Sequence, residues 1–250
     1  MIAGMAQPAL EQRLAERERP TARVFGYQRW EHLLFLHWAW DPAVIQARLP
    51  AGLTVDTHDG QAWLGVVPFF MNRIRPAFLP AVPWLSYFLE LNLRTYVVDA
   101  QGRSGVWFFS LDCDRALAVW VARWRFHLPY QHAIMSATVD GTRVAYASRR
   151  RRDAHTARFR YEPTAAPHAA EPGSLEFFLA ERYRLFAARR DGRLFTGQVH
   201  HVPYPLSPAR VEACDARVLE LAGFAAPGRP PDHALYARRV DVDVFPLRQA

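Results

Sequence analysis

The clearest alternation of apolar and polar side chains runs from Tyr87 to Asp99 and predicts a strand with two different faces. Leucines occupy successive positions of one face. The other face carries, in order, Glu90, Asn92, Arg94 and Tyr96. A half-exposed strand would turn this polar face to water, whereas a closed barrel would turn it inward, and the pattern alone leaves both alternatives open.

Further strand patterns lie on both sides of this segment. The compact aromatic stretch Tyr27–Trp40 predicts a buried strand, and Ala234–Pro246 predicts another near the end of the chain. Asp-Gly pairs at 59–60, 140–141 and 191–192 separate strand-like segments, and this dipeptide favours the tight turn of a β-hairpin. The sequence therefore predicts several antiparallel hairpins.

A few segments have helical patterns instead. The segment after Asp41 and the segment after Ser174 each begin with a residue that caps helices well. Cys113–Leu128 places apolar side chains at helical spacing. Residues 207–223 begin with Ser-Pro and end with glycine, which predicts a capped amphipathic helix.

Together these elements predict a mostly β (α+β) fold, a curled antiparallel sheet or β-barrel with a few flanking helices. Residues 1–24 are rich in Ala, Glu and Arg, and we expect them to form a charged leader at the periphery. No repeat or linker divides residues 25–250, which we expect to form one domain. Prolines space the long loop 72–84, a candidate lid.

The charged residues limit the chemistry that the chain can perform. The formal net charge is +7, and all 31 basic residues are arginines. An amine nucleophile on a side chain can come only from lysine, so covalent imine chemistry has no side-chain candidate in this sequence.

Cysteine usage and hydropathy indicate the compartment. Cys113 and Cys214 stand far apart and outside any CxxC pattern, and unpaired thiols favour a reducing cytoplasm. The first twenty residues lack the apolar core of a secretory signal. Pro76–Leu89, the longest uncharged stretch, is too short to span a bilayer. We therefore expect a cytoplasmic protein without a transmembrane segment.

The motif search excludes several classes of enzyme. The sequence contains no GxGxxG, no Walker motif, no GxSxG elbow and no HExxH, so we expect no nucleotide cofactor. Neighbouring His200 and His201 would face opposite sides of a strand, and His127 and His132 have no standard ligand spacing, so no metal is expected. The basic run Arg149–Arg152 matches no nucleic-acid module, which argues against nucleic acid as a partner.

Eight segments between residues 27 and 246 together resemble the YqjF-like family of bacterial proteins, a domain of unknown function. The segments follow the family's order: Gln28–Trp38, Leu49–Phe69, Glu90–Val97, Gly105–Asp112, Leu128–Ala133, Gly173–Tyr183, Gly197–His201 and Tyr236–Pro246. Each segment alone is a weak signal, but eight in order are specific. Only the leader falls outside the resemblance.

At the level of fold, that family resembles the acetoacetate decarboxylase-like β-barrels. Decarboxylases of that type carry a Gly-Arg-Glu-x-Trp-Gly-x-Pro-Lys-Lys signature, whose first lysine forms an imine. Ala122–Gln131 lines up with this signature, and Arg123 and Pro129 match it, but Tyr130 and Gln131 stand in place of the lysines. The resemblance therefore implies the barrel without the Schiff-base decarboxylation.

The implied barrel turns the Glu90 face inward, where a charged side chain needs a partner or a ligand. Glu90 is then the candidate acid or base, and Tyr130 the candidate hydroxyl donor. We expect the ligand to be a small organic acid or related anionic metabolite, held by arginine and oriented by the other side chains. The expected ligand-binding residues are Arg29, Asn92, Arg94, Tyr96, Trp107 and Arg123.

An alternative hypothesis is an interaction protein with a sealed structural core. In that case Arg149–Arg152 or the Pro76–Trp84 loop would contact an anionic macromolecule or membrane surface. The sequence leaves the oligomeric state open, a homo-oligomer included.

Overall fold

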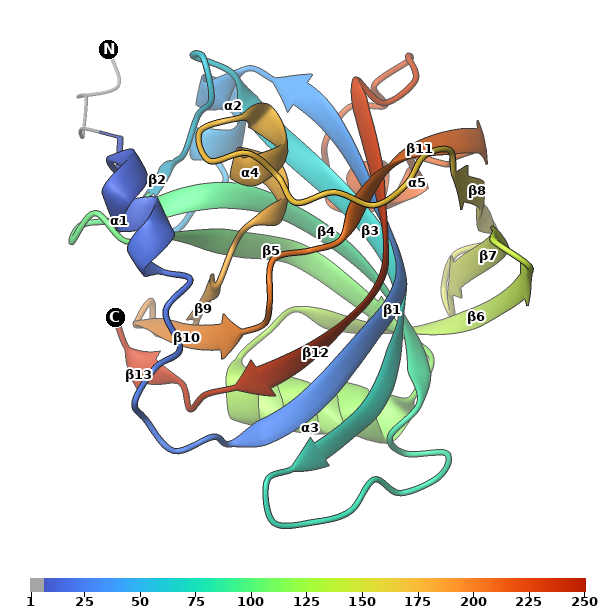
Figure 1. Ribbon diagram of the computed structural model, residues 1–250, viewed down its shortest axis with the longest axis horizontal. Helices are drawn as coiled ribbons and strands as arrows, with labels where there is room; N and C mark the ends of the chain where they lie inside the picture. Colours follow the sequence, from blue (N-terminus) through green and yellow to red (C-terminus); the bar gives the residue numbers. More distant parts are fainter. Residues whose placement is uncertain (1–6) are drawn as a thin grey trace.

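A computed structural model describes residues 7–250, without the side chains of residues 121–123, and in this part of the chain thirteen strands form one curled sheet (Figure 1). The strands are β1 (Gly26–Trp40), β2 (Leu53–Val55), β3 (Ala62–Pro76), β4 (Phe88–Asp99), β5 (Ser104–Cys113), β6 (Tyr130–Asp140), β7 (Arg143–Arg150), β8 (Ala157–Pro163), β9 (Arg184–Ala188), β10 (Leu194–His200), β11 (Leu206–Ala213), β12 (His233–Val244) and β13 (Arg248–Gln249). The helices are α1 (Leu10–Ala15), α2 (Pro42–Gln46), α3 (Ala116–Phe126), α4 (Leu175–Ala180) and α5 (Arg217–Leu221). The predicted mostly β architecture with a few flanking helices is confirmed.

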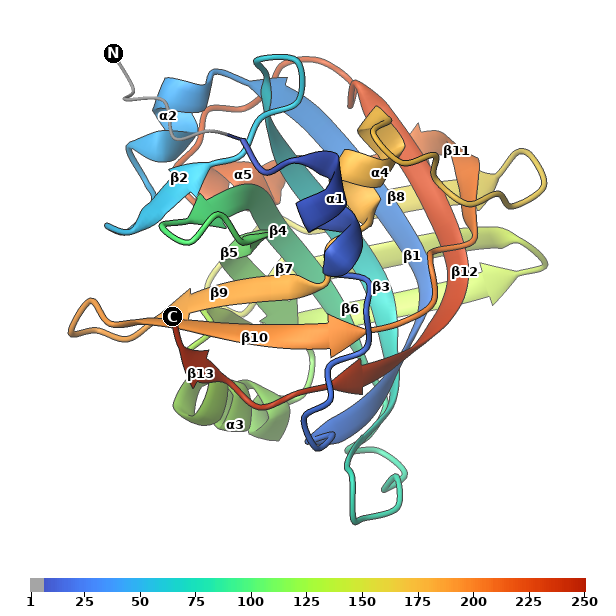
Figure 2. The same ribbon diagram turned by 60° about the vertical axis from the view of Figure 1, so that its left-hand side comes forward.

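Two closed rings of strands share one wall. The wall consists of β12, β1, β3, β4 and β5, in that order of pairing. On one side, β10 and β9 connect β12 back to β5 and close the first ring. On the other side, β11, β8, β7 and β6 connect the same two strands and close the second ring. Figures 1 and 2 show β9 and β10 on one side of the wall and β6, β7 and β8 on the other.

The shared wall explains why β4 is buried on both faces. Its leucine face, with Leu91 and Leu93, belongs to the apolar core of the second ring, which also contains Tyr146 and Tyr161. Its polar face turns into the first ring. The exposed fractions on that face are 2% for Glu90, 7% for Asn92, 8% for Arg94 and 0% for Tyr96. Of the two alternatives left open by the alternation, the structure has the inward one.

The helix predicted over residues 207–223 is wrong in its first half. Residues Leu206–Ala213 form β11, and only Arg217–Leu221 are helical. Positions in β11 alternate between more and less buried, a pattern of period two that the helical interpretation overlooked. As a strand, this segment pairs with β8 and β12, and these two neighbours supply hydrogen-bond partners for its backbone.

The turn predicted at Asp59-Gly60 forms, but it does not join a hairpin of two long strands. Asp59 and Gly60 both have positive φ, at 50° and 78°, as this tight turn requires. The strand before the turn, β2, pairs with β4 instead of β3. The local turn signal was therefore right, and the strand partner expected from it was wrong.

The described part of the leader, from residue 7 onward, is attached to the barrel by ion pairs. No residue of α1 is buried, and the helix lies beside α4 (Figure 2). Arg13 Nη1 nevertheless lies 2.6 Å from Oδ2 of the buried Asp56. Arg17 Nη2 lies 3.5 Å from Oε2 of the buried Glu181. Two arginines of this surface segment thus reach carboxylates inside the fold.

Candidate functional site

A carboxylic acid and a phenol meet inside the first ring. Glu90 lies near the start of β4, and Tyr130 opens β6, which runs parallel to β5 there. The Tyr130 hydroxyl donates a hydrogen bond of 2.8 Å to Glu90 Oε2. Burial raises the pKa of Glu90 to about 7, although hydrogen bonds from Tyr130 and Asn92 oppose the shift. A carboxyl with such a pKa can both donate and accept a proton near neutral pH.

Farther along the same face of β4, Arg94 and Tyr96 converge on one carbonyl oxygen. Leu179 O accepts hydrogen bonds from Arg94 Nη2 at 3.0 Å and from the Tyr96 hydroxyl at 2.8 Å. Leu179 belongs to α4, whose first turn is fixed because Ser174 Oγ accepts from the Phe177 amide. The cap of this short helix therefore helps to position the carbonyl that holds Arg94.

Two histidines extend the network from Tyr96. His37 Nε2 lies 2.9 Å from the Tyr96 oxygen, and His37 Nδ1 lies 3.3 Å from His233 Nδ1. Because the Tyr96 hydroxyl donates to Leu179 O, its oxygen accepts from His37 Nε2, and His37 Nδ1 then accepts from His233. Burial first, and then the charges of His233 and Arg94, lower the pKa of His37, so its imidazole is neutral.

Three buried polar atoms near this network have no hydrogen-bond partner among the described residues: Asn92 Oδ1, Arg94 Nε and His201 Nε2. His201 donates through Nδ1 to Val202 O at 2.7 Å, so its Nε2 carries a lone pair. Burial lowers the pKa of His201 to about 4, helped by repulsion from His200, Arg94 and Arg17. These three atoms are one unpaired donor, Arg94 Nε, and two unpaired acceptors, Asn92 Oδ1 and His201 Nε2.

Gly65 on β3 lets Arg94 and His37 pack closely against the wall. A Cβ at this position would lie 3.3 Å from Arg94 Cγ and 3.3 Å from His37 Cδ2. Both contacts are tighter than ordinary van der Waals distance, so a larger residue would displace one of the two side chains. The glycine allows an arginine and a histidine to share this part of the ring.

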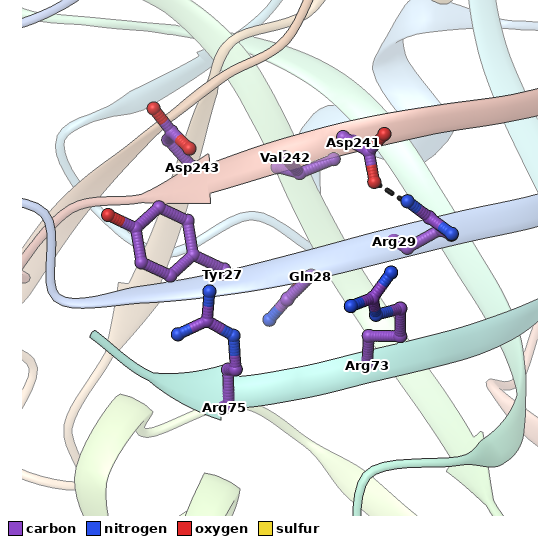
Figure 3. A pocket seen from close by; sticks show the side chains of 8 residues that line it. All are labelled: Tyr27, Gln28, Arg29, Arg73, Arg75, Asp241, Val242 and Asp243. Carbon is purple, nitrogen blue, oxygen red and sulfur yellow. Dashed lines mark hydrogen bonds and ion pairs between the residues drawn. The ribbon is translucent and has the colours of Figure 1, made fainter. Parts of the chain in front are cut away.

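The structure does not bring all of the expected site residues together. Arg29 lies on the outside of β1, where its Nε is 2.7 Å from Asp241 Oδ1. It borders a depression of about 220 Å³ formed by β1, β3 and β12 (Figure 3). Trp107 pairs in register with Thr95, on the face of the wall opposite Arg94, and packs near Phe186. The side chain of Arg123, on α3, lies outside the described residues.

A second buried polar group lies outside the set of site residues expected from the sequence. Glu181 accepts hydrogen bonds from the Tyr183 hydroxyl and from the Tyr204 amide. Arg182 Nη1 lies 2.8 Å from Asp56 Oδ2. The signal in the sequence was the charged pair that directly follows the apolar helix α4, because charges so close to a buried segment require partners. Asp56, which follows β2, carried a similar signal.

The described residues hold neither a metal-binding cluster nor a membrane-spanning helix. They contain no group of three or more His, Cys, Asp or Glu side chains that could hold a metal ion. None of their helices is long and apolar enough to cross a membrane. Burial raises the pKa of the Cys113 thiol, which leaves this cysteine a poor nucleophile.

Comparison with known proteins gives the family. Residues 27–241 match DUF2071, a family described as an uncharacterized conserved protein. The chain belongs to this family. It is 40% identical to the uncharacterized protein YqjF of Bacillus subtilis (strain 168) over 223 residues, which cover 89% of this chain and 91% of the relative. The resemblance to YqjF-like proteins is thereby confirmed.

Solved structures place this DUF2071 protein among the acetoacetate decarboxylase-like folds. An acetoacetate decarboxylase-like enzyme from Sphingomonas wittichii RW1 superposes with a TM-score of 0.60 at 17% identity, covering 91% of this chain and 94% of that one. The enduracididine biosynthesis enzyme MppR, complexed with pyruvate, superposes with a TM-score of 0.61 at 13% identity, covering 93% of each chain. At these identities the similarity concerns the fold.

Proposed function

We propose that this DUF2071 protein binds a small organic acid or related anionic metabolite inside the first ring, with Arg94 as the anchor. The observation that carries the proposal is the environment of the Arg94 guanidinium. Arg94 is 8% exposed, and its guanidinium donates a hydrogen bond to a backbone carbonyl. It forms no ion pair with a carboxylate among the described residues, and its Nε has no hydrogen-bond partner among them. A buried cation without a counter-ion is costly, and a ligand carboxylate would supply the missing charge.

The unpaired acceptors indicate which further groups the ligand should carry. Asn92 Oδ1 and His201 Nε2 both require a donor. A carboxylate that carries a neighbouring hydroxyl or amide group would satisfy these acceptors as well as Arg94. MppR, which shares the fold, forms a complex with pyruvate. Pyruvate and its 2-hydroxy counterpart lactate are therefore the first probes.

Glu90 and Tyr130 supply the candidate chemistry. A carboxyl with a pKa of about 7 can move a proton to or from a bound acid without forming a covalent bond. Imine decarboxylation has no side chain to carry it, because the chain contains no lysine. We therefore propose binding with non-covalent acid–base chemistry and place the protein in the cytoplasm, where the free thiols of Cys113 and Cys214 stay reduced.

The alternative function, contact with an anionic partner through Arg149–Arg152, has weaker support. Arg150 Nε lies 2.9 Å from Asp112 Oδ1, so this arginine already has a buried carboxylate as partner. Arg151 and Arg152 are exposed. Two exposed arginines at a turn are an ordinary solvated surface, and this favours the interior site.

Thermal unfolding with pyruvate, lactate and the uncharged ester methyl pyruvate tests the proposal. We expect the two acids, at concentrations well above Kd, to raise the Tm of the wild type by several degrees, and the ester to have no effect. Arg94→Met, which keeps bulk but removes charge, should abolish the shift, and Gly65→Ala should reduce it by narrowing the ring. Arg158→Ala, at an exposed arginine of β8, is the matched control and should respond like the wild type. If Arg94→Met and the wild type gain the same Tm from every acid, or if no acid raises the Tm, the interior is a closed structural core.

A further inference from the structure

Exposed apolar side chains concentrate at one end of the molecule. They come from Phe25, from the segment between β3 and β4, and from α3. Their exposed fractions are 36% for Phe25, 78% for Phe78, 48% for Leu79, 44% for Val82, 64% for Trp84, 40% for Tyr87, 45% for Leu117, 62% for Trp120 and 69% for Trp124. We call these residues the aromatic face. Large exposed apolar surfaces of this kind mark contact with a partner or a membrane.

Contacts join the three segments that carry the aromatic face. The Phe25 ring lies 5.7 Å from the ring of Phe126, at the end of α3, and Phe25 O accepts from the Ala77 amide at 3.0 Å. Arg115 Nε, at the start of α3, donates to Trp84 O at 3.0 Å. Figure 1 shows α3 and the β3–β4 connection at the same end of the barrel. Trp120 and Trp124 stack in parallel, with 6.1 Å between their centroids.

The charges around this face are positive. Residues 77–87 and 115–127 contain no Asp or Glu. Arg75 Nη1 donates to Leu79 O at 3.3 Å, and the Arg125 guanidinium lies 5.3 Å from the Phe25 ring centroid. Neither arginine forms an ion pair with another described residue, whereas Arg115 is paired with Asp114 at 3.1 Å. Apolar surface and unpaired cations thus occur together.

The apolar surface and the unpaired arginines together distinguish between three possible partners of the aromatic face: a second copy of the chain, a nucleic acid and a lipid bilayer. A symmetric contact with a second copy would bring Arg75 and Arg125 against arginines of the same patch, with no acid there to neutralise them. A nucleic acid could stack bases on the tryptophans, but it offers little to the aliphatic side chains of Leu79, Val82 and Leu117. A bilayer with anionic phospholipids matches both the apolar and the cationic side chains.

We propose that the aromatic face docks this protein peripherally on membranes that contain anionic phospholipids. Trp84, Trp120 and Trp124 would lie at the level of the headgroups, where amphipathic indole rings are favoured. Arg75 and Arg125 would contact lipid phosphates. Arginines near an anionic surface add an electrostatic attraction, which salt weakens. The contact is peripheral because no described helix can cross a bilayer.

Co-sedimentation with vesicles tests this proposal. We expect the wild type to sediment with vesicles of phosphatidylcholine and phosphatidylglycerol at low salt, with a blue shift of tryptophan fluorescence, and to bind pure phosphatidylcholine at least tenfold more weakly. Trp120→Ser with Trp124→Ser should weaken binding to mixed vesicles about tenfold or more. Arg75→Gln with Arg125→Gln should remove most of the salt dependence. Val202→Ser, at an apolar residue 66% exposed outside the aromatic face, is the matched control and should bind like the wild type.

Three outcomes would overturn the proposal. The first is no binding of the wild type to mixed vesicles at low salt. The second is equal binding by the wild type and the double tryptophan variant. The third is a concentration-dependent dimer, or RNA binding, that depends on the tryptophans while vesicle binding does not. Unchanged Tm values would show that the variants fold, and a retained Tm response to pyruvate would separate this surface from the proposed interior site.

Discussion

At the scale of single residues, the interior of the first ring stabilises its two β4 charges in different ways. Glu90 receives hydrogen bonds from Tyr130 and Asn92, and its raised pKa lets it become neutral. Arg94 cannot become neutral near physiological pH, so it depends on the Leu179 carbonyl and on a ring contact with Phe35, 5.4 Å from its guanidinium. The acid can lose its charge on burial, whereas the arginine keeps its charge.

The raised pKa of Glu90 predicts a pH dependence of stability. The carboxyl has a pKa of 4.5 when exposed and about 7 in the fold, so between these values the folded state binds more protons than the unfolded state. The free energy of unfolding should therefore fall as pH rises from about 4.5 to 7, by up to about 3 kcal/mol from this group. Glu90→Gln should lose this part of the slope, as measured by urea denaturation at several pH values.

Tyr130→Phe is the companion variant for this measurement. It removes a hydrogen bond that lowers the pKa of Glu90, so the fall in stability should begin near the same pH but continue to a higher pH. Asp112, whose pKa burial raises to about 6, contributes equally to all three proteins and cancels in the comparison. Parallel pH profiles of the wild type and Glu90→Gln would contradict the prediction.

At the scale of elements, the two short helices α4 and α1 help to bring charged side chains to buried partners. α4 provides the Leu179 carbonyl, and directly after it come Glu181 and Arg182, which bind Tyr183 and Asp56. α1 adds Arg13, which reaches both oxygens of Asp56, at 2.6 and 2.7 Å. A segment expected from the sequence to be a charged peripheral leader thus forms an ion pair with a buried aspartate.

We therefore expect Arg13→Met to destabilise the protein by about 1–3 kcal/mol, because Asp56 would keep Arg182 as its partner but lose a bidentate one. The free energy of unfolding from urea titration at neutral pH measures the loss. Arg23→Met, at an exposed arginine of the same segment without an ion pair to a described residue, should change stability by less than about 0.5 kcal/mol. Equal effects of the two substitutions would mean that the ion pair with Asp56 contributes nothing measurable.

At the scale of the whole molecule, two rings share one wall, and this gives β4 an apolar environment on one face and a polar one on the other. The second ring packs leucines against tyrosines and phenylalanines, as a structural core does. The first ring encloses carboxylates, arginines and histidines beside its apolar residues. The first ring therefore has the more polar interior of the two, although the second ring encloses the ion pair of Asp112 with Arg150.

The absence of lysine from the whole chain also predicts the outcome of an experiment that traps imines by reduction. Incubation with pyruvate and cyanoborohydride should modify no internal residue, because no side chain bears a primary amine. Intact mass followed by peptide mapping measures this, with a lysine-dependent acetoacetate decarboxylase-like enzyme as the positive control. An adduct within any peptide other than the amino-terminal one would contradict the prediction.

Most strands could be predicted from the sequence because alternation and Asp-Gly turns are local signals. The exceptions show what local signals lack. Ser207-Pro208 predicts a helix start, but the segment forms β11 and pairs with β8 and β12. The strand β2 pairs with β4 and not with β3, the strand that follows the neighbouring turn. Strand pairing is decided by segments far apart in the chain, which propensity does not describe.

Some residues of the candidate site could likewise be predicted from local sequence, and others could not. Glu90, Asn92, Arg94 and Tyr96 share a face because they are spaced by two along one strand, and this follows from backbone geometry alone. Arg29 lies outside and pairs with Asp241, because its neighbour Trp30 packs inward and successive side chains of a strand point to opposite faces. His37, Glu181 and His201 join the interior from distant segments, so no spacing rule connects them with β4.

By itself, the sequence determined which chemistry is absent and which side chains alternate: a chain without lysine has no side-chain imine, whatever its fold. Only the tertiary structure decided which alternating face is enclosed, because burial depends on the second layer of strands and helices that closes over a sheet. It also decided that Arg94 is buried without a carboxylate partner among the described residues, since the distance between residues remote in sequence is set by the closed ring and not by the chain.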